Sequence, residues 1–340
     1  MKSRPFATVI YCLFMTTVYP VSANEAETFV FMALGDTAYK DDRYADYHKL
    51  IERINKHEPD FSIHVGDTMG YQLCSDDTFS NITNSFQLFN NPLIYTPGDN
   101  EWADCYKPDL SSDTNPVEFA DYRLERLDTL RKLYFSTNQS LGKKTFKLTR
   151  QSYVDQKYAE FKENSYWVHK GVLFATVHIV GSNDSFHPHL ENLTKESIRR
   201  RGANYAWIMN LIEVAKENQV KAVVVAAHAE LFENKTSHGS VANYSGQQVR
   251  GGHLGPYVGY VYALSNLAKE FSKPILYIHG DAHKFIIDRP LLIHGGNHDP
   301  KDLRNTNFTR LQVYGDPEDK AVMITVDLNK ENVFSFTPFN

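Results

Sequence analysis

The sequence has only three cysteines, no basic excess and, after its first 23 residues, no apolar run long enough to span a membrane. It also lacks a low-complexity tract, a repeat of fixed period and a Pro/Gly/Ser-rich linker. These absences exclude a disordered chain and a repeat array. They indicate that residues 24–340 form a single domain. The formal charge of −5 and the lack of a basic stripe argue against binding of long nucleic acid. A hydrophobic content of 42% suits a globular fold instead.

The first 23 residues resemble a cleavable leader. Two basic residues precede an apolar run over residues 6–19 and the small-residue ending Val21-Ser22-Ala23. This pattern predicts a signal peptide over residues 1–23 and an exported protein, periplasmic or secreted. The leader carries two basic residues and no acid, so its removal takes the formal charge from −5 to −7. It also removes one cysteine, which leaves Cys74 and Cys105 as a pair that an oxidising compartment would favour linking.

Short apolar runs alternate with helical patterns through most of the chain, which predicts an α/β fold with helices on the faces of a sheet. Near the end of the chain, strand patterns follow one another without helices, which predicts antiparallel strands there. The predicted strands are Thr28–Leu34, Phe61–Val65, Pro92–Thr96, Val172–Val180, Ala222–Ala227 and Ile275–His279, and then Thr309–Tyr314, Ala321–Asp327 and Val333–Phe336. The predicted helices are Asp46–Lys56, Val117–Leu133, Lys195–Glu217 and Tyr257–Phe271.

Five of the predicted strands end in a carboxylate or an imidazole. The endings are Gly35-Asp36-Thr37, Gly66-Asp67-Thr68, Gly98-Asp99-Asn100-Glu101, His228 and Gly280-Asp281-Ala282-His283. Taken singly, each has a plain structural explanation, because Gly-Asp is a common turn and a histidine at a strand end is usually hydrogen-bonded. The ordered set favours a metal site, because the carboxyl ends of parallel strands meet at one edge of a sheet.

In this order the motifs resemble those of the calcineurin-like metallophosphoesterases, the superfamily that includes the purple acid phosphatases. The segments Pro97–Trp102 and His279–His283 resemble PGDNEW and HGDxH of an exported bacterial-type branch, and the resemblance continues through Gly181–Asp184 and Asn307–Asp316. It implies a four-layer α/β/β/α sandwich with mixed sheets. It also implies hydrolysis of phosphate esters by a hydroxide that bridges two metal ions.

Carried over residue by residue, the resemblance implies a ligand set for two ions. Asp36 and His283 would bind the first ion, Asp67 would bridge both, and His228 would bind the second. Asp99 stands at the position of the usual asparagine ligand, and Asp281 at the position of a usual histidine. Oxygen ligands in such numbers suit iron, manganese, magnesium or calcium rather than zinc alone.

The sequence departs from the family pattern at two motif positions. Ala38 occupies the place of a histidine ligand, and Tyr71 is a candidate replacement. Asn100 replaces the usual motif histidine, so it can donate a hydrogen bond to phosphate but no proton to a leaving group. Esters with poor leaving groups should therefore react slowly. His298, in a second Gly-Asn-His-Asp sequence, could supply the acid if its loop reached the metals, although its context favours a surface loop.

Four aspartates against two divalent ions leave no surplus positive charge for an anionic substrate. A trivalent ion, a carboxylate outside the ligand set, a nearby arginine or the absence of phosphate chemistry would each resolve this. The expected function is therefore a modest phosphoesterase for a small phosphate ester, with Asp67 and Asn100 in catalytic positions. The alternatives are a metal-stabilised exported binding protein and a phosphodiesterase or nuclease.

Two further features of the sequence have plain structural explanations. Asn183 is a possible substrate contact or a turn residue, and Arg199–Arg201 suits a solvated helix face.

Overall fold

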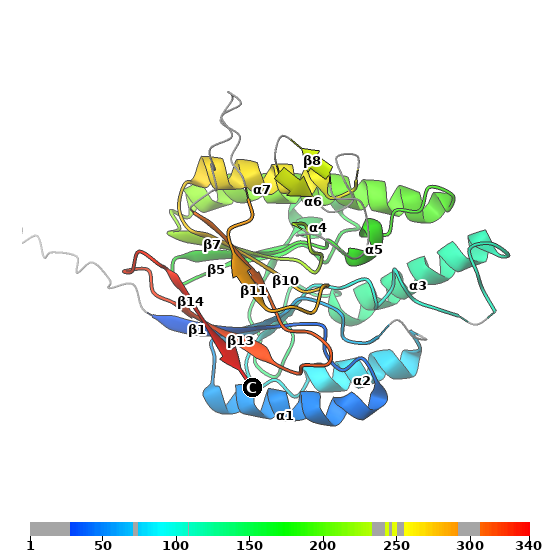
Figure 1. The fold of residues 1–340 in the computed structure, drawn as a ribbon, viewed down its shortest axis with the longest axis horizontal. Helices are drawn as coiled ribbons and strands as arrows, with labels where there is room; N and C mark the ends of the chain where they lie inside the picture. The colour runs from blue at the N-terminus through cyan, green and yellow to red at the C-terminus, as the bar shows by residue number, and fades with distance from the viewer. Residues whose placement is uncertain are drawn as a thin grey trace, which may run out of the picture.

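Two β-sheets face each other, and helices cover the outer side of each (Figure 1). The computed structural model describes residues 28–70, 74–107, 109–232, 242–244, 247–249, 255–291 and 307–340. One sheet has the order β14-β13-β1-β2-β3, and the other has the order β11-β12-β10-β7-β6-β5-β4. The first comprises β1 (Phe29–Leu34), β2 (Phe61–His64), β3 (Leu93–Tyr95), β13 (Ala321–Val326) and β14 (Phe334–Phe339). The second comprises β4 (Thr149–Arg150), β5 (Ser165–His169), β6 (Val172–Thr176), β7 (Ala222–Ala226), β10 (Ile275–His279), β11 (Ile286–Asp288) and β12 (Phe308–Gln312).

Three separate apolar clusters fill the spaces between these layers. Side chains such as Phe31, Phe61 and Phe174 meet between the two sheets. The other face of the five-stranded sheet packs against α1 (Tyr44–His57), α2 (Asp76–Phe86) and α3 (Pro116–Tyr134). The other face of the seven-stranded sheet packs against α6 (Glu191–Glu217) and α7 (Val258–Phe271). This confirms the predicted four-layer α/β/β/α sandwich.

Alternation along β1 shows how the sequence determines the layers. Phe31 and Ala33 belong to the cluster between the sheets, whereas Met32 and Leu34 belong to the cluster under the helices. Successive side chains of a strand point to opposite faces, so a strand that is apolar at every position must be covered on both sides. In α1 the buried residues Tyr47, Leu50, Ile51 and Ile54 recur at helical spacing and form the stripe that covers the sheet.

Both sheets are mixed. β1, β2 and β3 run parallel, whereas β13 and β14 are antiparallel, as predicted for the end of the chain. The strand near residue 309, β12, has one neighbour of each kind, because it pairs antiparallel with β11 on one side and parallel with β10 on the other. The predicted strand Val172–Val180 ends at Thr176. The carbonyl of Ile179 instead accepts the amides of His228 and Ala229, which draws this segment toward the end of β7.

Two helical features differ from the predictions. α2 was not predicted, although Ser75 caps it by accepting a hydrogen bond from the amide of Thr78 at 3.1 Å. Arg200 is fully buried, which corrects the prediction of a solvated face for Arg199–Arg201. Its charge is tolerated there because Asp184 and Glu196 both pair with it. Within the described parts of the chain, no helix is long and apolar enough to cross a membrane.

Candidate metal centre

The loops that follow five strands bring acidic and imidazole side chains together. They come from both sheets, and not from one sheet edge as the sequence suggested. The loops after β1, β2 and β3 carry Asp36, Asp67 and Asp99, and those after β7 and β10 carry His228, Asp281 and His283. Two groups have ligand atoms within 4.8 Å of one another, namely Asp36–Asp67–His228 and Asp99–His228–Asp281. His283 joins the first group, with its Nε2 atom 3.4 Å from Oδ1 of Asp36.

Several of these residues have a left-handed backbone. The φ angles are 53° at Asp36, 53° at Asp67, 73° at Asp281 and 56° at His283. Residues other than glycine rarely adopt this conformation, and they do so mainly where the surrounding structure enforces it at functional sites. Close packing around the loops adds to this constraint. A Cβ atom at Gly280 would lie 2.0 Å from Oδ2 of Asp36, so the backbone there can approach the carboxylate only because the residue is glycine.

Backbone carbonyls orient the two imidazoles. Nδ1 of His228 lies 2.8 Å from the carbonyl of Val65, and Nδ1 of His283 lies 3.1 Å from the carbonyl of Asp316. Each Nδ1–H therefore donates to a carbonyl and leaves Nε2 facing the carboxylates, which is the usual arrangement of a histidine that binds metal. Nε2 of His228 lies 2.9 Å from Oδ1 of Asp99 and 3.4 Å from Oδ1 of Asp67.

The charges at this site perturb one another strongly. Burial raises the pKa of Asp67 well above its ordinary value. Burial alone would lower the pKa of His228, but the carboxylates of Asp67 and Asp99 raise it well above the ordinary value. Burial likewise opposes ionisation of Asp99, yet His228 holds the pKa of Asp99 below its usual range. The metal-free site therefore holds protons that a bound cation would displace.

Three buried ligand atoms make no ordinary hydrogen bond, and they test whether the residues fit a metal. They are Oδ2 of Asp36, and Oδ1 of Asp99 and Nε2 of His228, which face each other at 2.9 Å as an ion pair. Buried polar atoms are normally hydrogen-bonded, so this concentration of acidic and imidazole atoms at a single place needs an explanation. Carboxylate oxygen and neutral imidazole nitrogen are ordinary ligands of divalent metals. The side chains present therefore fit a pair of cations.

Comparison with known proteins identifies the family. The sequence model of the calcineurin-like phosphoesterases matches residues 29–285. The chain belongs to this family. No curated protein matches the chain in sequence. A dimetal phosphatase from Danio rerio is similar in structure, with a TM-score of 0.49 and 9% identity over 92% of this chain and 98% of that one. The GAP50 anchor of the Plasmodium inner membrane complex is similar with a TM-score of 0.46 and 13% identity, over 92% and 89% of the two chains.

In this family member a tyrosine that the sequence analysis missed lies among the ligands. The phenol oxygen of Tyr39 donates to Oδ2 of Asp67 at 2.7 Å and lies 3.3 Å from Oδ1 of Asp36 and 2.9 Å from Nε2 of His283. Burial and the charges of Asp67 and Asp36 raise the pKa of Tyr39, so the phenol keeps its proton in the metal-free protein. The adjacent residue, Ala38, stands at the position of the usual histidine and is buried in the apolar cluster between the five-stranded sheet and its helices.

Glu101 and Asn100 connect the loops after β2 and β3. One carboxylate oxygen of Glu101 accepts the amide and hydroxyl of Thr68, at 2.8 and 2.9 Å, and the other accepts the amide of Gly98 at 3.0 Å. The backbone amide of Asn100 donates to Oδ1 of Asp67 at 3.1 Å, and its side-chain amide donates to the carbonyl of Met69 at 2.9 Å. These hydrogen bonds join the loops that carry Asp67 and Asp99 into one unit.

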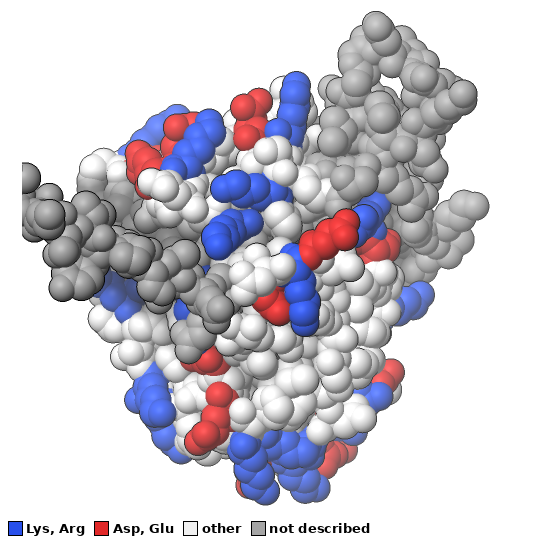
Figure 2. Space-filling view, turned by 90° about the vertical axis from the view of Figure 1, so that its left-hand side faces the viewer, with Lys and Arg blue, Asp and Glu red and all other residues white. Residues whose placement is uncertain are grey.

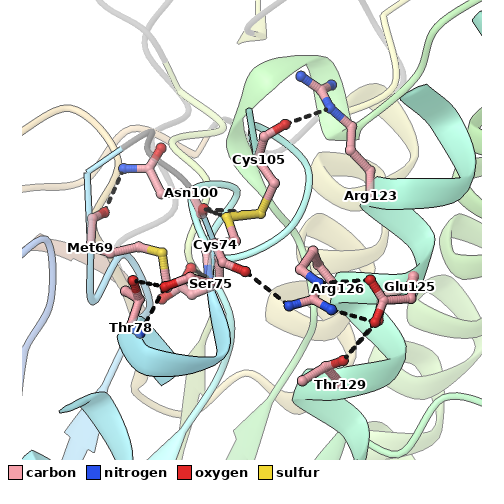
Figure 3. The surroundings of a disulfide bond; sticks show 12 residues. Met69, Cys74, Ser75, Thr78, Asn100, Cys105, Arg123, Glu125, Arg126 and Thr129 are labelled. Atoms are coloured by element: carbon pink, nitrogen blue, oxygen red, sulfur yellow. Dashed lines mark hydrogen bonds and ion pairs between the residues drawn. A yellow bond between two sulfur atoms is a disulfide. The ribbon is translucent and has the colours of Figure 1, made fainter. Parts of the chain in front are cut away.

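The predicted disulfide joins the same two segments (Figure 3). Cys74 and Cys105 are both fully buried, and their Cα atoms lie 5.6 Å apart. Arginines of α3 hold the two cysteine carbonyls: Arg126 donates to that of Cys74 at 2.9 Å and Arg123 to that of Cys105 at 3.4 Å. The covalent link therefore closes the loop unit next to the metal ligands.

The centre opens into a cavity of about 770 Å³, a size typical of small-molecule sites. Among the described residues that line it, Lys40 is the single lysine or arginine. Asp104, which the sequence analysis did not select, also lines it, and burial together with Asp99 raises the pKa of Asp104 to about 6. The full lining is Tyr39, Lys40, Asp67, Gly70, Asp99, Asn100, Asp104, Asp281, His283 and Asp316.

Of the additional residues that the sequence suggested, the structure describes only Asn183, which is not among the residues that line the cavity. Asn183 is exposed, and its side-chain amide donates to the carbonyl of Phe186 at 3.1 Å, as expected of a turn residue. Tyr71 and His298 lie outside the described residues, as does the leader over residues 1–23. The strand-end residues and Tyr39 therefore define the candidate site.

Proposed function

We propose that the protein is a metal-dependent phosphoesterase that hydrolyses small phosphate esters at a centre of two cations. The observation that carries the proposal is the convergence of buried carboxylate and imidazole ligand atoms, within 4.8 Å of one another in the groups Asp36–Asp67–His228 and Asp99–His228–Asp281. Membership of the family and the open cavity beside these atoms support it. Two adjacent cations lower the pKa of a shared water and neutralise charge on the phosphoryl oxygens.

The side chains of this protein would position those ions and the substrate. Asp36, His283 and the phenol of Tyr39 surround the first ion position, and Asp99, His228 and Asp281 surround the second. Asp67 lies between the groups, with Oδ2 on Tyr39 and Oδ1 3.4 Å from Nε2 of His228. The carbonyls of Val65 and Asp316 keep both imidazoles in the tautomer that presents Nε2.

The charge of the cavity constrains which ions and substrates suit it. Asp36, Asp67, Asp99 and Asp281 carry four formal negative charges, which two divalent ions only balance. We infer that one ion is trivalent, or that one carboxylate stays protonated, because an anionic ester needs a positive centre. The oxygen-rich donor set supports a hard ion such as iron or manganese.

Asn100 bears on the leaving group. Its side-chain amide donates to the carbonyl of Met69, and an amide cannot act as a general acid at any ordinary pH. Aryl phosphates, whose leaving groups depart without protonation, should therefore be hydrolysed faster than alkyl phosphates, by up to ~10²–10⁴-fold. Equal rates on both would show that another group supplies the proton.

The direct test uses purified protein of known metal content and a panel of phosphate mono- and diesters. Hydrolysis that depends on added metal and is lost in Asp67→Asn would support the proposal. Tyr106→Phe, at an exposed position, is a matched control that should keep the activity. Metal binding without hydrolysis of any ester would support the alternative of a metal-stabilised binding protein, which the acidic cavity favours.

A nuclease is the less suitable alternative. On the face shown in Figure 2, lysine and arginine side chains are interspersed with acidic ones. A protein that binds long nucleic acid without base contacts usually has a continuous basic surface. Single-stranded oligonucleotides in the same panel would test this point.

We also propose that the protein is exported and folds under oxidising conditions. The leader pattern of residues 1–23 and the buried disulfide between Cys74 and Cys105 support this. Amino-terminal sequencing of protein recovered outside the cytosol should begin at Asn24.

A further inference from the structure

The chain after β6 contains four consecutive residues with left-handed backbone. The φ angles are 47° at Ser182, 59° at Asn183, 54° at Asp184 and 52° at Ser185. We call Ser182–Ser185 the left-handed turn; its first part is labelled α5 (Gly181–Asp184) in Figure 1. Left-handed residues other than glycine normally occur singly, because each is unfavourable for an L-amino acid. Four in succession need an enforcing structure and a reason.

The enforcing structure is a buried cluster around Asp184. One oxygen of its carboxylate accepts from Arg200, and the other accepts from the hydroxyl of Tyr260 at 2.8 Å. Arg200 also donates to the backbone carbonyl of Asp184 at 2.9 Å, and the amide of Asp184 donates to the hydroxyl of Tyr257 at 2.9 Å. Asp184 and Arg200 are both 0% exposed. The cluster therefore anchors the turn to α6 and α7.

The other end of the turn touches the second ion position. The hydroxyl of Ser182 donates to Oδ2 of Asp99 at 2.8 Å and lies 2.5 Å from Oδ2 of Asp104. Gly181 lies against the same group, because a Cβ atom there would be 2.7 Å from Oδ1 of Asp99 and 2.7 Å from Oδ1 of Asp281. The contact with Ser182 engages Oδ2 of Asp99, while Oδ1 of Asp99 faces Nε2 of His228 at 2.9 Å.

The same arginine also supports the loop that carries Asp99. The guanidinium of Arg200 lies 5.3 Å from the ring centre of Trp102, and the amide of Trp102 donates to the carbonyl of Asp99 at 3.2 Å. One buried side chain thus fixes both the turn and the loop that the turn contacts. Arg200 therefore sets the position of the turn relative to the loop, and this position determines where the carboxylate of Asp99 lies.

We propose that Ser182 is a positioning residue for the second cation, which the left-handed turn holds so that Asp99 presents Oδ1 together with His228 and Asp281. This inference rests on the proposed function, because it assumes that two cations bind. It assigns to Ser182 an effect on the second ion alone. The contacts of Ser182 at the centre are with Asp99, which belongs to the second ion position, and with Asp104.

The test separates the effect of relieving backbone strain from the effect of losing the Ser182 hydroxyl. Ser182→Gly removes the hydroxyl and relieves the left-handed strain, whereas Asn183→Gly relieves the same strain one residue later and leaves the contact with Asp99 intact. Both variants should fold, and both should be at least as stable as the wild type without metal. Titration calorimetry with Mn²⁺ and elemental analysis after dialysis then measure the affinity and number of bound ions.

We expect wild type and Asn183→Gly to bind two ions. Ser182→Gly should bind the first ion normally and the second 10–100-fold more weakly, the usual effect of losing a group that orients a ligand. Ser182→Asn, which tolerates the left-handed backbone and keeps a donor, should recover part of the loss. Two ions bound with unchanged affinities by Ser182→Gly would overturn this inference alone. A wild-type protein that binds fewer than two ions would overturn the proposed function as well.

Discussion

The phenol oxygen of Tyr39 lies 2.7 Å from Oδ2 of Asp67, and this contact joins the loop after β1 to the loop after β2 inside the metal centre. Because the same oxygen lies 2.9 Å from Nε2 of His283, the tyrosine also reaches a ligand from the second sheet. No other described tyrosine lines the cavity. Tyr39 is therefore the residue whose removal should most directly report on the first ion position.

Tyr39→Phe should lower the affinity for the first ion by about 10–100-fold, because it removes an oxygen that holds Asp67 and faces the ion. Competition with a chelator of known affinity measures this. Tyr106→Phe, at a position with 52% exposure, is the control. If the affinities of the two variants were equal, Tyr39 would only fill space.

Metal removal should destabilise the protein. Asp36, Asp67 and Asp99 are buried close together, and bound cations would offset the repulsion among them. With free metal at about 100 times its dissociation constant, the gain in the free energy of unfolding is about 2.7 kcal/mol. Thermal unfolding with and without a chelator should show a lower Tm for the stripped protein and a much smaller shift in Asp67→Asn. An unchanged wild-type Tm would contradict cation binding.

The disulfide should contribute to stability as well as to the site. Replacing Cys74 and Cys105 by alanine should lower the free energy of unfolding by about 2–4 kcal/mol, measured by urea unfolding. Affinity for the second ion should fall too, because the Cys105 segment follows Asp99 directly and shares its loop. Normal metal affinity in the double variant would show that hydrogen bonds alone hold that loop.

Acid should destabilise the protein through His64. Burial, and secondarily the charge of His228, lowers the pKa of His64 from 6.5 to about 3. Between these values the unfolded chain binds a proton that the folded chain does not, so the free energy of unfolding falls as the pH falls. The slope for one such histidine is about 1.4 kcal/mol per pH unit.

Urea unfolding of metal-free protein from pH 7 to pH 4 measures this slope. His64→Gln should remove from this slope the contribution of one proton, even if the substitution also changes the free energy of unfolding at pH 7. His57→Gln, on the exposed side of α1, is the control variant. A slope that His64→Gln leaves unchanged would assign the acid sensitivity to other groups.

The candidate ligands that the sequence predicts to lie together are clearest where they directly follow apolar strands. Asp36, Asp67 and Asp99 each come after a buried run and a glycine, a local signal that fixes both the strand and the turn. Tyr39 had no such signal, because its place depends on left-handed backbone at Asp36 and Ala38 that returns the chain to the site.

Long-range partners explain the other differences. The sequence pattern predicts that Arg200 is one of three surface arginines. Only the tertiary structure places Asp184 opposite its guanidinium. The role of Ser182 likewise has no local signal in the sequence, because its contact with Asp99 joins segments that are 83 residues apart. Such contacts have no local pattern, so they remain beyond a single sequence.

The division of the ligands between two sheets has a consequence for the order of assembly. As the chain is synthesised, the three aspartates of the first sheet are made well before His228, Asp281 and His283. An unfinished chain could offer the carboxylates and the phenol of Tyr39 but neither imidazole of the site, and oxygen ligands suit magnesium or calcium better than metals that prefer imidazole nitrogen. The site can therefore select a metal through its imidazole nitrogens only after the second sheet has formed.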